Sequence, residues 1–179
     1  NTSGSVTWCL DSKSFFYSKL DKFHRPRQIY KHVLGTSVKE DKLIFEEKDD
    51  TFTCGIGLTS DEKFYTISTS DHITTEEYFF SSNTENIEPK LFKKREKDVR
   101  YSIDSWGEFF YIHTNKDARD YKVLRCKKND IEKLEEFIPS KKETVIGDLD
   151  FLDGFIIRGE KSDAIPKLFV RNIQTNKEE

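Results

Sequence analysis

Four histidines are the side chains in this sequence best suited to moving a proton or binding a metal ion at neutral pH. His32 lies in a strand-like segment and His113 in an aromatic one, while His24 and His72 lie in polar stretches. No cluster of carboxylates and histidines has the spacing of a metal site. We therefore expect each histidine to have a hydrogen-bonded structural role, with metal binding or proton transfer as the alternative.

Three cysteines offer a second kind of chemistry: Cys9, Cys54 and Cys126. Their number is odd, their spacing is wide and no Cys-x-x-Cys occurs, so the pattern predicts neither a disulfide framework nor a zinc site. Their neighbours, such as Trp8 and Ile56, are apolar, and no histidine is adjacent. We interpret them as buried strand thiols, and a reactive thiol is the alternative.

Two short motifs that often mark ligand sites have simpler interpretations here. Gly55-Ile56-Gly57 has no helix pattern after it and does not complete a dinucleotide fingerprint, so it indicates close approach of backbones. Lys93-Lys94-Arg95 is short and is followed by Glu96 and Asp98, which argues against nucleic-acid binding. The chain also lacks a Gly-x-Ser-x-Gly nucleophile elbow. We assign no catalytic, cofactor-binding or metal-binding residue, and we predict no cofactor.

The elements that position these residues must be built on aromatic side chains. Only 35% of the 179 residues are hydrophobic, yet the chain has 15 Phe, 7 Tyr and 2 Trp, and no Met. Large rings of this kind favour pleated sheets over helical bundles. The composition therefore predicts an all-β protein.

The charge pattern excludes two classes of partner. The net charge is −3, with both signs interspersed, so no strong field attracts nucleic acid or an anionic membrane. No window reaches the roughly 18 apolar residues of a membrane helix, and the first residues lack the regions of a secretion signal. We expect a cytoplasmic protein that binds neither nucleic acid nor membranes.

A repeat is visible in the aromatic residues. Phe16, Phe64, Phe110 and Phe155 each open an aromatic strand-like segment, and they are about 45 to 48 residues apart. This period is typical of β-propeller blades, each a four-stranded antiparallel sheet. We therefore expect Phe16, Phe64 and Phe110 to be equivalent core residues between blades.

The strands of each unit can be placed from alternation and turn residues. They are 6–10, 15–19, 28–34 and 42–46, then 52–58, 63–68, 75–80 and 90–92, then 99–103, 109–114, 122–126 and 134–138, and finally 145–149, 154–158 and 168–173. In the third unit, residues 129–136 are interpreted as a loop before the outer strand rather than a helical turn capped by Asp130.

The resulting blades are 5–47, 51–93, 98–139 and 144–179, and the last blade lacks its fourth strand. Charged runs such as Glu46 to Asp50 lie where the chain crosses from one blade to the next, and we expect them to be solvated turns of little energetic consequence. The alternative is that some face a partner domain.

About three and three-quarter blades cannot close a ring. An open ring leaves two unpaired sheet edges, which invites association with other strands. We expect the chain to be part of a larger propeller, with a truncated product that associates edge to edge with a second copy as the alternative.

Four sequence segments, occurring in a fixed order along the chain, resemble those of a known protein family. The strings are HRPRQIYKHVLGTSVKEDKLIFEEKDDTF, SDHITTEEYFF, EPKLFKKREKDVRYSID and FFYIHTNKDARDYKVLR. Together they resemble the propeller of the oligopeptidase B (protease II) branch of the prolyl oligopeptidase family, from about Trp8 to the end of the chain. The match to the string around His32 also suggests that this histidine has a fixed partner, such as a neighbouring backbone carbonyl.

The resemblance implies a cytosolic serine peptidase that cuts short peptides after Arg or Lys. In that family a seven-bladed propeller covers an α/β-hydrolase domain and excludes folded proteins, and the first strand of each blade lines its tunnel. This chain would supply about the middle half of such a propeller and would itself be inactive. The catalytic Ser, Asp and His, and the acidic groups that bind the basic side chain of the substrate, belong to the hydrolase domain, so none is carried over to a residue here.

Two other classes remain for comparison. A non-catalytic propeller that serves as a protein-interaction platform would have the same repeat. An extracellular sandwich adhesin is disfavoured by the repeat length and by the absence of paired cysteines.

Overall fold

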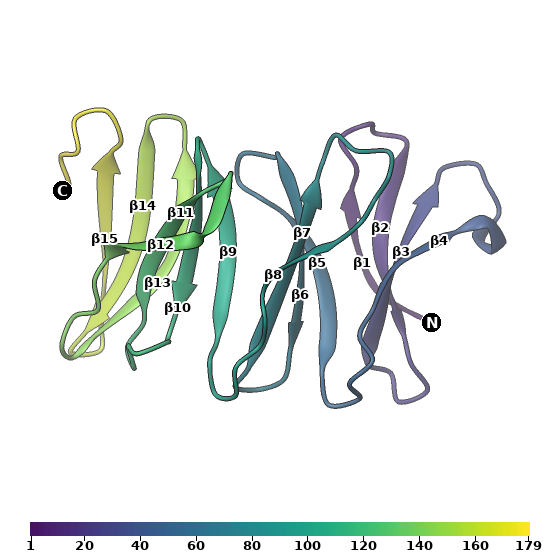
Figure 1. Cartoon of the computed structure of the whole chain (residues 1–179), viewed down its shortest axis with the longest axis horizontal. Helices are drawn as coiled ribbons and strands as arrows, with labels where there is room; N and C mark the ends of the chain where they lie inside the picture. The colour runs from purple at the N-terminus through teal and green to yellow at the C-terminus, as the bar shows by residue number, and fades with distance from the viewer. The chain divides into compact units, whose positions relative to one another are not determined.

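The computed structural model describes residues 1–179 and is all-β, as the composition predicts (Figure 1). Its strands form separate antiparallel sheets, three with four strands and one with three. The chain divides into two compact units, Asn1–Asp98 and Val99–Glu179, here called the N-terminal and C-terminal units. The structure contains no helix with the length and apolarity needed to span a bilayer.

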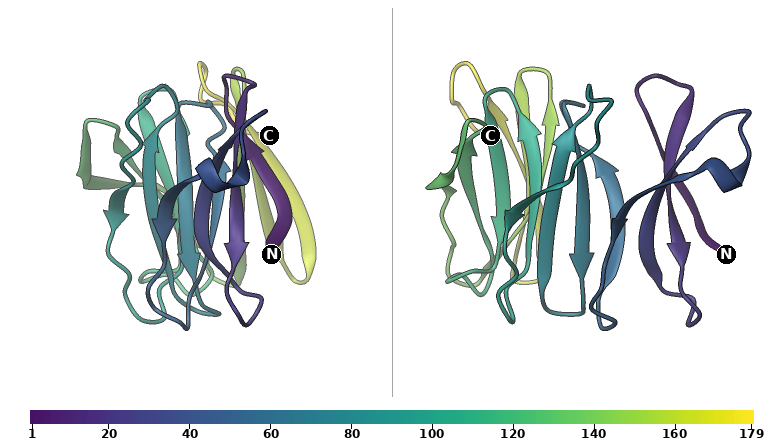
Figure 2. Two further views of the ribbon diagram at one scale, coloured as in Figure 1. Left: turned by 90° about the vertical axis from the view of Figure 1, so that its right-hand side faces the viewer. Right: turned by 45° about the vertical axis from the view of Figure 1, so that its right-hand side comes forward.

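The first sheet of the N-terminal unit follows the chain order. Its strands are β1 (Thr2–Trp8), β2 (Ser14–Leu20), β3 (Pro26–Val33) and β4 (Lys42–Glu46). The connection from β3 to β4 contains a short 3-10 turn, Val38–Glu40, that the sequence analysis did not predict (Figure 2). A capping box between Ser37 and Glu40 explains the turn, because each side chain binds the backbone N–H of the other end.

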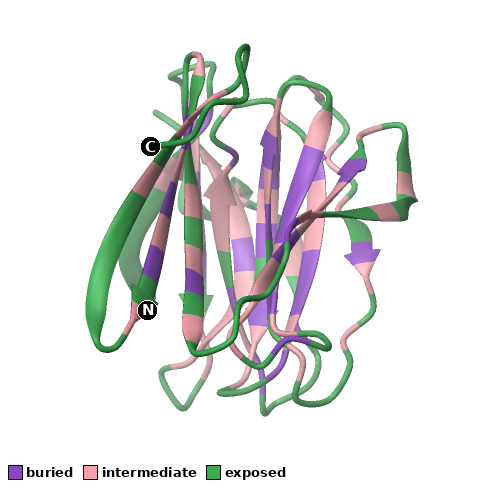
Figure 3. Cartoon of the chain, turned by 90° about the vertical axis from the view of Figure 1, so that its left-hand side faces the viewer, coloured by how far each residue is buried: buried purple, intermediate pink, exposed green.

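The second sheet repeats the same order. Its strands are β5 (Thr53–Leu58), β6 (Phe64–Ser70), β7 (Thr75–Ser81) and β8 (Lys90–Lys93). Buried and exposed residues alternate along the strands (Figure 3), as expected for sheets with two different faces. The two sheets share one core, in which Phe16 contacts Tyr65 at 4.9 Å and Phe80 at 5.7 Å between ring centroids.

The expectation that Phe64 is a core residue equivalent to Phe16 is wrong, because its neighbour Tyr65 enters the core. Phe16 and Tyr65 are 1% and 2% exposed and meet in the shared core, whereas Phe64 is only half-buried on the opposite face of its sheet and packs against Phe79. Because side chains alternate between faces, a slip of one position exchanges core and outer residues. The aromatic pair Phe64-Tyr65 concealed this slip, since both members suit a core.

The C-terminal unit contains the other two sheets. The third sheet consists of β9 (Tyr101–Trp106), β10 (Phe109–Thr114), β11 (Lys122–Lys127) and β12 (Asp130–Ile138). The loop expected for residues 129–136 is wrong, because β12 begins at Asp130. Lys127 pairs with Asp130 across a two-residue hairpin, so ladder hydrogen bonds start at once.

The fourth sheet consists of β13 (Thr144–Leu152), β14 (Phe155–Ser162) and β15 (Ile165–Asn172). Beyond β15 the chain turns back, and Val170 and Glu179 exchange two backbone hydrogen bonds of 2.8 and 3.0 Å. This sheet has three strands, as the sequence analysis predicted, and an isolated bridge between Arg171 and Glu178 follows β15.

The third and fourth sheets also share a core. Val123 and Ile146 are fully buried, and the rings of Tyr111 and Phe151 lie 4.7 Å apart. Phe110 is buried, as expected, but on the face opposite Tyr111, and Phe155 is 41% exposed while its neighbour Ile156 enters the core. The aromatic repeat therefore located the strands, and it located a buried ring at Phe16 and Phe110 but not at Phe64 or Phe155.

The connection between the two units is fixed on both sides. The backbone N–H of Asp98 donates to Thr74 Oγ1 at 3.1 Å, within the N-terminal unit. The backbone N–H of Arg100 donates to Asn115 Oδ1 at 2.7 Å, within the C-terminal unit.

Candidate functional site

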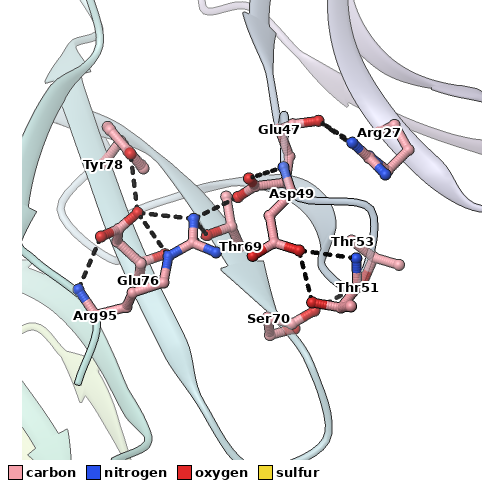
Figure 4. A network of polar contacts seen from close by, with 10 residues as sticks. All are labelled: Arg27, Glu47, Asp49, Thr51, Thr53, Thr69, Ser70, Glu76, Tyr78 and Arg95. Atoms are coloured by element: carbon pink, nitrogen blue, oxygen red, sulfur yellow. Dashed lines mark hydrogen bonds and ion pairs between the residues drawn. The ribbon is translucent and has the colours of Figure 1, made fainter. Parts of the chain in front are cut away.

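A buried charge network joins the two sheets of the N-terminal unit (Figure 4). Glu47 follows β4, Glu76 lies on β7, and Arg95 follows β8. Arg95 Nη2 donates to Glu47 Oε2 at 2.6 Å and to Glu76 Oε2 at 2.9 Å. The two carboxylate side chains are only 5% and 6% exposed. One guanidinium therefore pairs with two carboxylates from neighbouring sheets.

Glu76 is the most fully bonded member of the network. It also accepts from the backbone N–H of Arg95 at 2.7 Å and from the hydroxyl of Tyr78 at 2.9 Å. Burial alone would raise the pKa of Glu76, but the hydrogen bonds from Arg95 outweigh it and lower the pKa below the usual value. The guanidinium of Arg95 also lies 3.9 Å from the ring centroid of Phe52.

Glu47 orders the crossing segment to which it belongs. Its Oε1 accepts from the backbone N–H of Asp49 at 2.9 Å, and its carbonyl accepts from Arg27 Nε at 3.0 Å. Asp49 in turn accepts from the backbone and hydroxyl of Thr51. The expectation that this charged run is only a solvated turn is therefore wrong for Glu47, because its side chain, between those of exposed Glu46 and Lys48, points into the sheet interface.

Glu77, next to Glu76, points to the other face of β7. Both of its carboxyl oxygens lie within hydrogen-bonding distance of Ser68 Oγ, at 2.7 and 2.8 Å. Burial raises the pKa of Glu77 to about 8, although the Ser68 hydroxyl acts in the opposite direction. Two adjacent glutamates in a strand could have indicated this arrangement from the sequence. Successive side chains of a strand point to opposite faces of the sheet, so the carboxylates of Glu76 and Glu77 must lie on different faces.

His32 has a fixed partner, but the partner is not the backbone carbonyl that was expected. Its Nδ1 donates to Asp41 Oδ1 at 2.7 Å, and the hydroxyl of Tyr17 donates to Asp41 Oδ2 at 2.7 Å. The Asp41 side chain is 3% exposed. Burial tends to raise the pKa of Asp41, but these two hydrogen bonds hold it below the usual value. Burial and the contact with Asp41 raise the pKa of Tyr17 to about 12.

His113 links the two sheets of the C-terminal unit. Its Nε2 lies 2.8 Å from the carbonyl oxygen of Ile146 and its Nδ1 lies 3.0 Å from Asp148 Oδ1. Its ring stacks on Tyr121 at 4.6 Å between centroids. His24 and His72 lie in turns and are exposed. No group of three or more potential metal ligands exists in the structure.

A second charge network lies in the C-terminal unit. Arg158, which is 3% exposed, donates from Nη1 to Glu178 Oε2 at 2.7 Å and from Nε to Glu160 Oε1 at 2.7 Å. Lys141 Nζ, from the crossing segment before β13, also donates to Glu160 at 2.7 Å. The hydrogen bonds from Arg158 lower the pKa of Glu178 to about 2. Each unit therefore has a charge network that includes a crossing segment.

The polar side chains in these arrangements are engaged with one another and hold the sheets in position. The carboxylates of Glu47 and Glu76 are committed to Arg95, and Asp41 is committed to His32 and Tyr17. Their chemistry is that of ion pairs that hold blade-like sheets and crossing segments together.

Comparison with known proteins places this architecture in a family. Residues 1–178 match the family model described as the prolyl oligopeptidase N-terminal beta-propeller domain. The chain belongs to the prolyl oligopeptidase family. Its separate antiparallel sheets are therefore blades of that propeller, and the predicted partial β-propeller is confirmed.

Curated members of the prolyl oligopeptidase family show how much of a whole peptidase the chain represents. It is 31% identical over 160 residues to Protease 2 of Moraxella lacunata, covering 89% of this chain and 23% of that protein. It is 28% identical over 177 residues to dipeptidyl aminopeptidase BI of Pseudoxanthomonas mexicana, covering 95% of this chain and 24% of that protein. The chain thus spans about a quarter of the length of these relatives.

Solved structures from the family share the fold. Oligopeptidase B from Trypanosoma brucei with covalently bound antipain matches with a TM-score of 0.90 and 24% identity, covering 97% of this chain and 25% of that chain. Oligopeptidase B from Leishmania major matches with a TM-score of 0.90 and 20% identity, covering 96% and 24%.

Within this propeller fold, burial explains the state of the cysteines, and the space around each glycine shows where backbones approach closely. All three cysteines are free and buried, and burial raises the pKa of Cys54 to about 12, which disfavours a reactive thiolate. The close backbone approach expected at Gly55 and Gly57 is wrong, because a Cβ on Gly55 would meet nothing within 4 Å. Such an approach occurs at Gly147, where a Cβ would lie 2.9 Å from the carbonyl oxygen of Gly159.

Proposed function

We propose that this chain is part of the substrate-gating propeller of an oligopeptidase B-like serine peptidase. The observation that carries the proposal is the match of nearly the whole chain to the family propeller, together with the ordered strings shared with the oligopeptidase B branch. The similarity to Protease 2 of Moraxella lacunata supports the choice of branch. We call the longer peptidase to which the chain would belong the parent.

The parent hydrolyses short peptides after Arg or Lys, and its catalytic Ser, Asp and His lie in an α/β-hydrolase domain outside this chain. The seven-bladed propeller selects substrates by access, since a ring of sheets leaves a narrow tunnel that a folded protein cannot enter. Rigid blades suit this role, because a gate that flexed would admit larger substrates. The ion pairs of Arg95 and Lys141 support it by joining crossing segments to neighbouring sheets.

The propeller's partners are the hydrolase domain of the same protein and the short basic peptides that the whole enzyme cuts. The parent is cytoplasmic, consistent with free buried cysteines rather than disulfides. The chain alone has no peptidase activity.

Peptidase assays test the proposal. The purified parent is expected to cleave a short fluorogenic peptide with Arg before the scissile bond at least tenfold faster than the same peptide with Pro there. It should leave a folded protein substrate intact, and the 179-residue chain should cleave nothing. A parent that prefers Pro belongs to another branch. A parent without peptidase activity on any of these peptides is a non-enzymatic propeller, and the proposal is then wrong.

A further inference from the structure

His113 lies at the joint between the third and fourth sheets. Because side chains alternate along a strand, it shares a face of β10 with Tyr111, whose ring belongs to the core between these sheets. The His113 side chain is 16% exposed, and its ring stacks on that of Tyr121. Burial and stacking fix the plane of the imidazole, so the neighbours of its two nitrogens are set by the fold.

The first neighbour is on β13, a strand that its own sheet holds from one side only. It is an edge strand, paired with β14 alone. On its other side, the backbone N–H of Ile146 donates to the carbonyl of Asp120 at 2.8 Å, and the carbonyl of Ile146 lies 2.8 Å from His113 Nε2. A carbonyl accepts hydrogen bonds and cannot donate them, so Nε2 carries a proton.

A β-bulge in β13 brings the second neighbour to the ring. Gly147 and Asp148 together lie opposite one residue of β14. Ile146 and Leu149 consequently both pack toward the shared core, which regular alternation does not allow for residues three apart. The extra residue re-aims the Asp148 side chain, whose Oδ1 lies 3.0 Å from His113 Nδ1.

The two neighbours determine how many protons the ring must carry. An ionised carboxylate, like a carbonyl, only accepts hydrogen bonds. The hydrogen bond from His113 is the main cause that lowers the pKa of Asp148 below its usual value, so the proton between them belongs to the imidazole. Both hydrogen bonds therefore require the imidazolium form, because neutral imidazole has a single N–H.

The other charged and titratable groups around this joint are of types that keep their charge near neutral pH. Three on or beside the fourth sheet pair with one another: Arg158, Glu160 and Lys141. Arg100, before β9, acts on Asp148 in the same direction as His113 by lowering its pKa. Asp120 and Tyr121 come from the segment before β11. Of these side-chain types, histidine is the one whose charge ordinarily changes between about pH 5 and 8.

We propose that His113 is a proton-dependent clamp that holds the bulge of β13 against the third sheet. In the protonated form it binds the Ile146 carbonyl and the Asp148 carboxylate. When Nδ1 gives its proton to water, the bond to Ile146 remains and Asp148, whose side chain is 87% exposed, is released into solvent. The inference involves no peptide and no catalytic group, so it does not rest on the proposed function.

The clamp acts on the bulge rather than on the stability of the whole unit. An ion pair with an exposed partner changes an equilibrium by roughly two- to fivefold. A change of that size is small beside global unfolding, and local opening of an edge strand is the process that it affects. Amide hydrogen exchange measures such opening directly.

Hydrogen exchange of the intact parent, followed by mass spectrometry at pH 5 and pH 8, tests the clamp. The readout is the exchange rate of the amides of residues 145–147, and each variant is compared with the unmodified parent at the same pH. His113→Gln resembles neutral imidazole, with one donor atom and one acceptor atom. It is expected to exchange roughly two- to fivefold faster at pH 5 and at an unchanged rate at pH 8.

Asp148→Asn is expected to give the reverse pattern. Its side-chain amide can accept from imidazolium and can also donate to neutral imidazole, so it keeps the clamp closed at both pH values. Exchange should be unchanged at pH 5 and roughly two- to fivefold slower at pH 8. His72→Gln, changed in an exposed turn, is the control and should alter neither rate.

Equal acceleration by His113→Gln at both pH values would show a merely structural histidine and overturn the proposal, as would no acceleration at pH 5. An Asp148→Asn variant that exchanges like the unmodified parent at pH 8 would overturn it as well. Strand β6 reports on the fold of each variant. If His113→Gln also accelerates exchange in β6, Asp148→Asn decides, because Asp148 is exposed. A parent without peptidase activity would refute the proposed function and leave these results unaffected.

Discussion

Arg95 Nη2 lies 2.6 Å from Glu47 Oε2 and joins the segment that follows β8 to the segment that follows β4. Both residues lie in charged runs that look like surface turns in the sequence, and both take part in a buried interface. Stability in this unit therefore depends on residues outside its strands, which gives the first prediction.

The Arg95→Met variant is expected to lose roughly 3–5 kcal/mol of unfolding free energy, because Glu47 and Glu76 would remain buried without their cation. Urea unfolding followed by far-UV circular dichroism measures the change. The exposed neighbour Lys94 provides the control, since Lys94→Met should change stability by less than about 0.5 kcal/mol. Equal effects of the two substitutions would contradict the network's role.

Phe16→Ala is expected to cost roughly 3–5 kcal/mol, because it removes a ring that contacts Tyr65 and Phe80 in the shared core. Phe23→Ala serves as the matched control, since Phe23 lies in a turn and is 63% exposed. A melting temperature of Phe16→Ala no lower than that of Phe23→Ala would mean that the sheets do not pack as described.

Glu77 makes stability depend on pH in the opposite direction to an ordinary ion-paired carboxylate. Its pKa is raised from 4.5 to about 8 in the folded state, so its contribution is full below about pH 4.5 and is lost as the pH rises through about 8. Glu77→Gln keeps an acceptor for Ser68 and cannot ionise. We expect the unfolding free energy of this variant to fall less between pH 5 and 9 than that of the unmodified chain. The Glu85→Gln variant, changed at an exposed position, should follow the pH profile of the unmodified chain. An unchanged pH profile for Glu77→Gln would refute this assignment.

Asp41→Asn is expected to cost about 1–3 kcal/mol at pH 7, because charge-assisted hydrogen bonds from His32 and Tyr17 are weakened. The pKa of Asp41 is lowered in the folded state, so its contribution exists above the usual value of 3.8 and is lost as the pH falls through the folded-state value. The gap between the two proteins should therefore narrow at pH 3. Asp50→Asn, at an exposed position, is the control, and a gap that widens at low pH would contradict the ion pair.

Gly147→Ala is expected to destabilise the C-terminal unit by about 1–3 kcal/mol, since the new Cβ would lie 2.9 Å from the backbone of Gly159. Gly55→Ala is the matched control, because a Cβ there meets nothing within 4 Å. Thermal unfolding of both variants gives the comparison. If Gly55→Ala proved the more harmful, the backbone contact at Gly147 would be unimportant.

The sequence was sufficient to predict the sheets and their order, because turn residues and alternating strands are local signals. It was insufficient to predict which face of a strand is inner where two aromatic residues are adjacent, as at Phe64 and Tyr65. That choice is made by the partner sheet, with which Tyr65 shares a core contact to Phe16.

The buried polar groups were the least predictable part of the structure. Glu47 stands among exposed charges in the sequence, and only Arg95, far along the chain, explains its burial. Likewise Asp41 follows the short 3-10 turn that brings it to His32. The first partnership joins residues 48 apart and the second depends on the geometry of the β3–β4 connection, so strand periodicity indicates neither.

The anchoring of Asp98 to Thr74 and of Arg100 to Asn115 has a mechanical consequence. Between the two anchored amides the backbone has only the torsion angles of Asp98 and Val99, so the free part of this linker is very short. Loss of either hydrogen bond would lengthen the free linker, so the side chains of Thr74 and Asn115 set its length from within their own units.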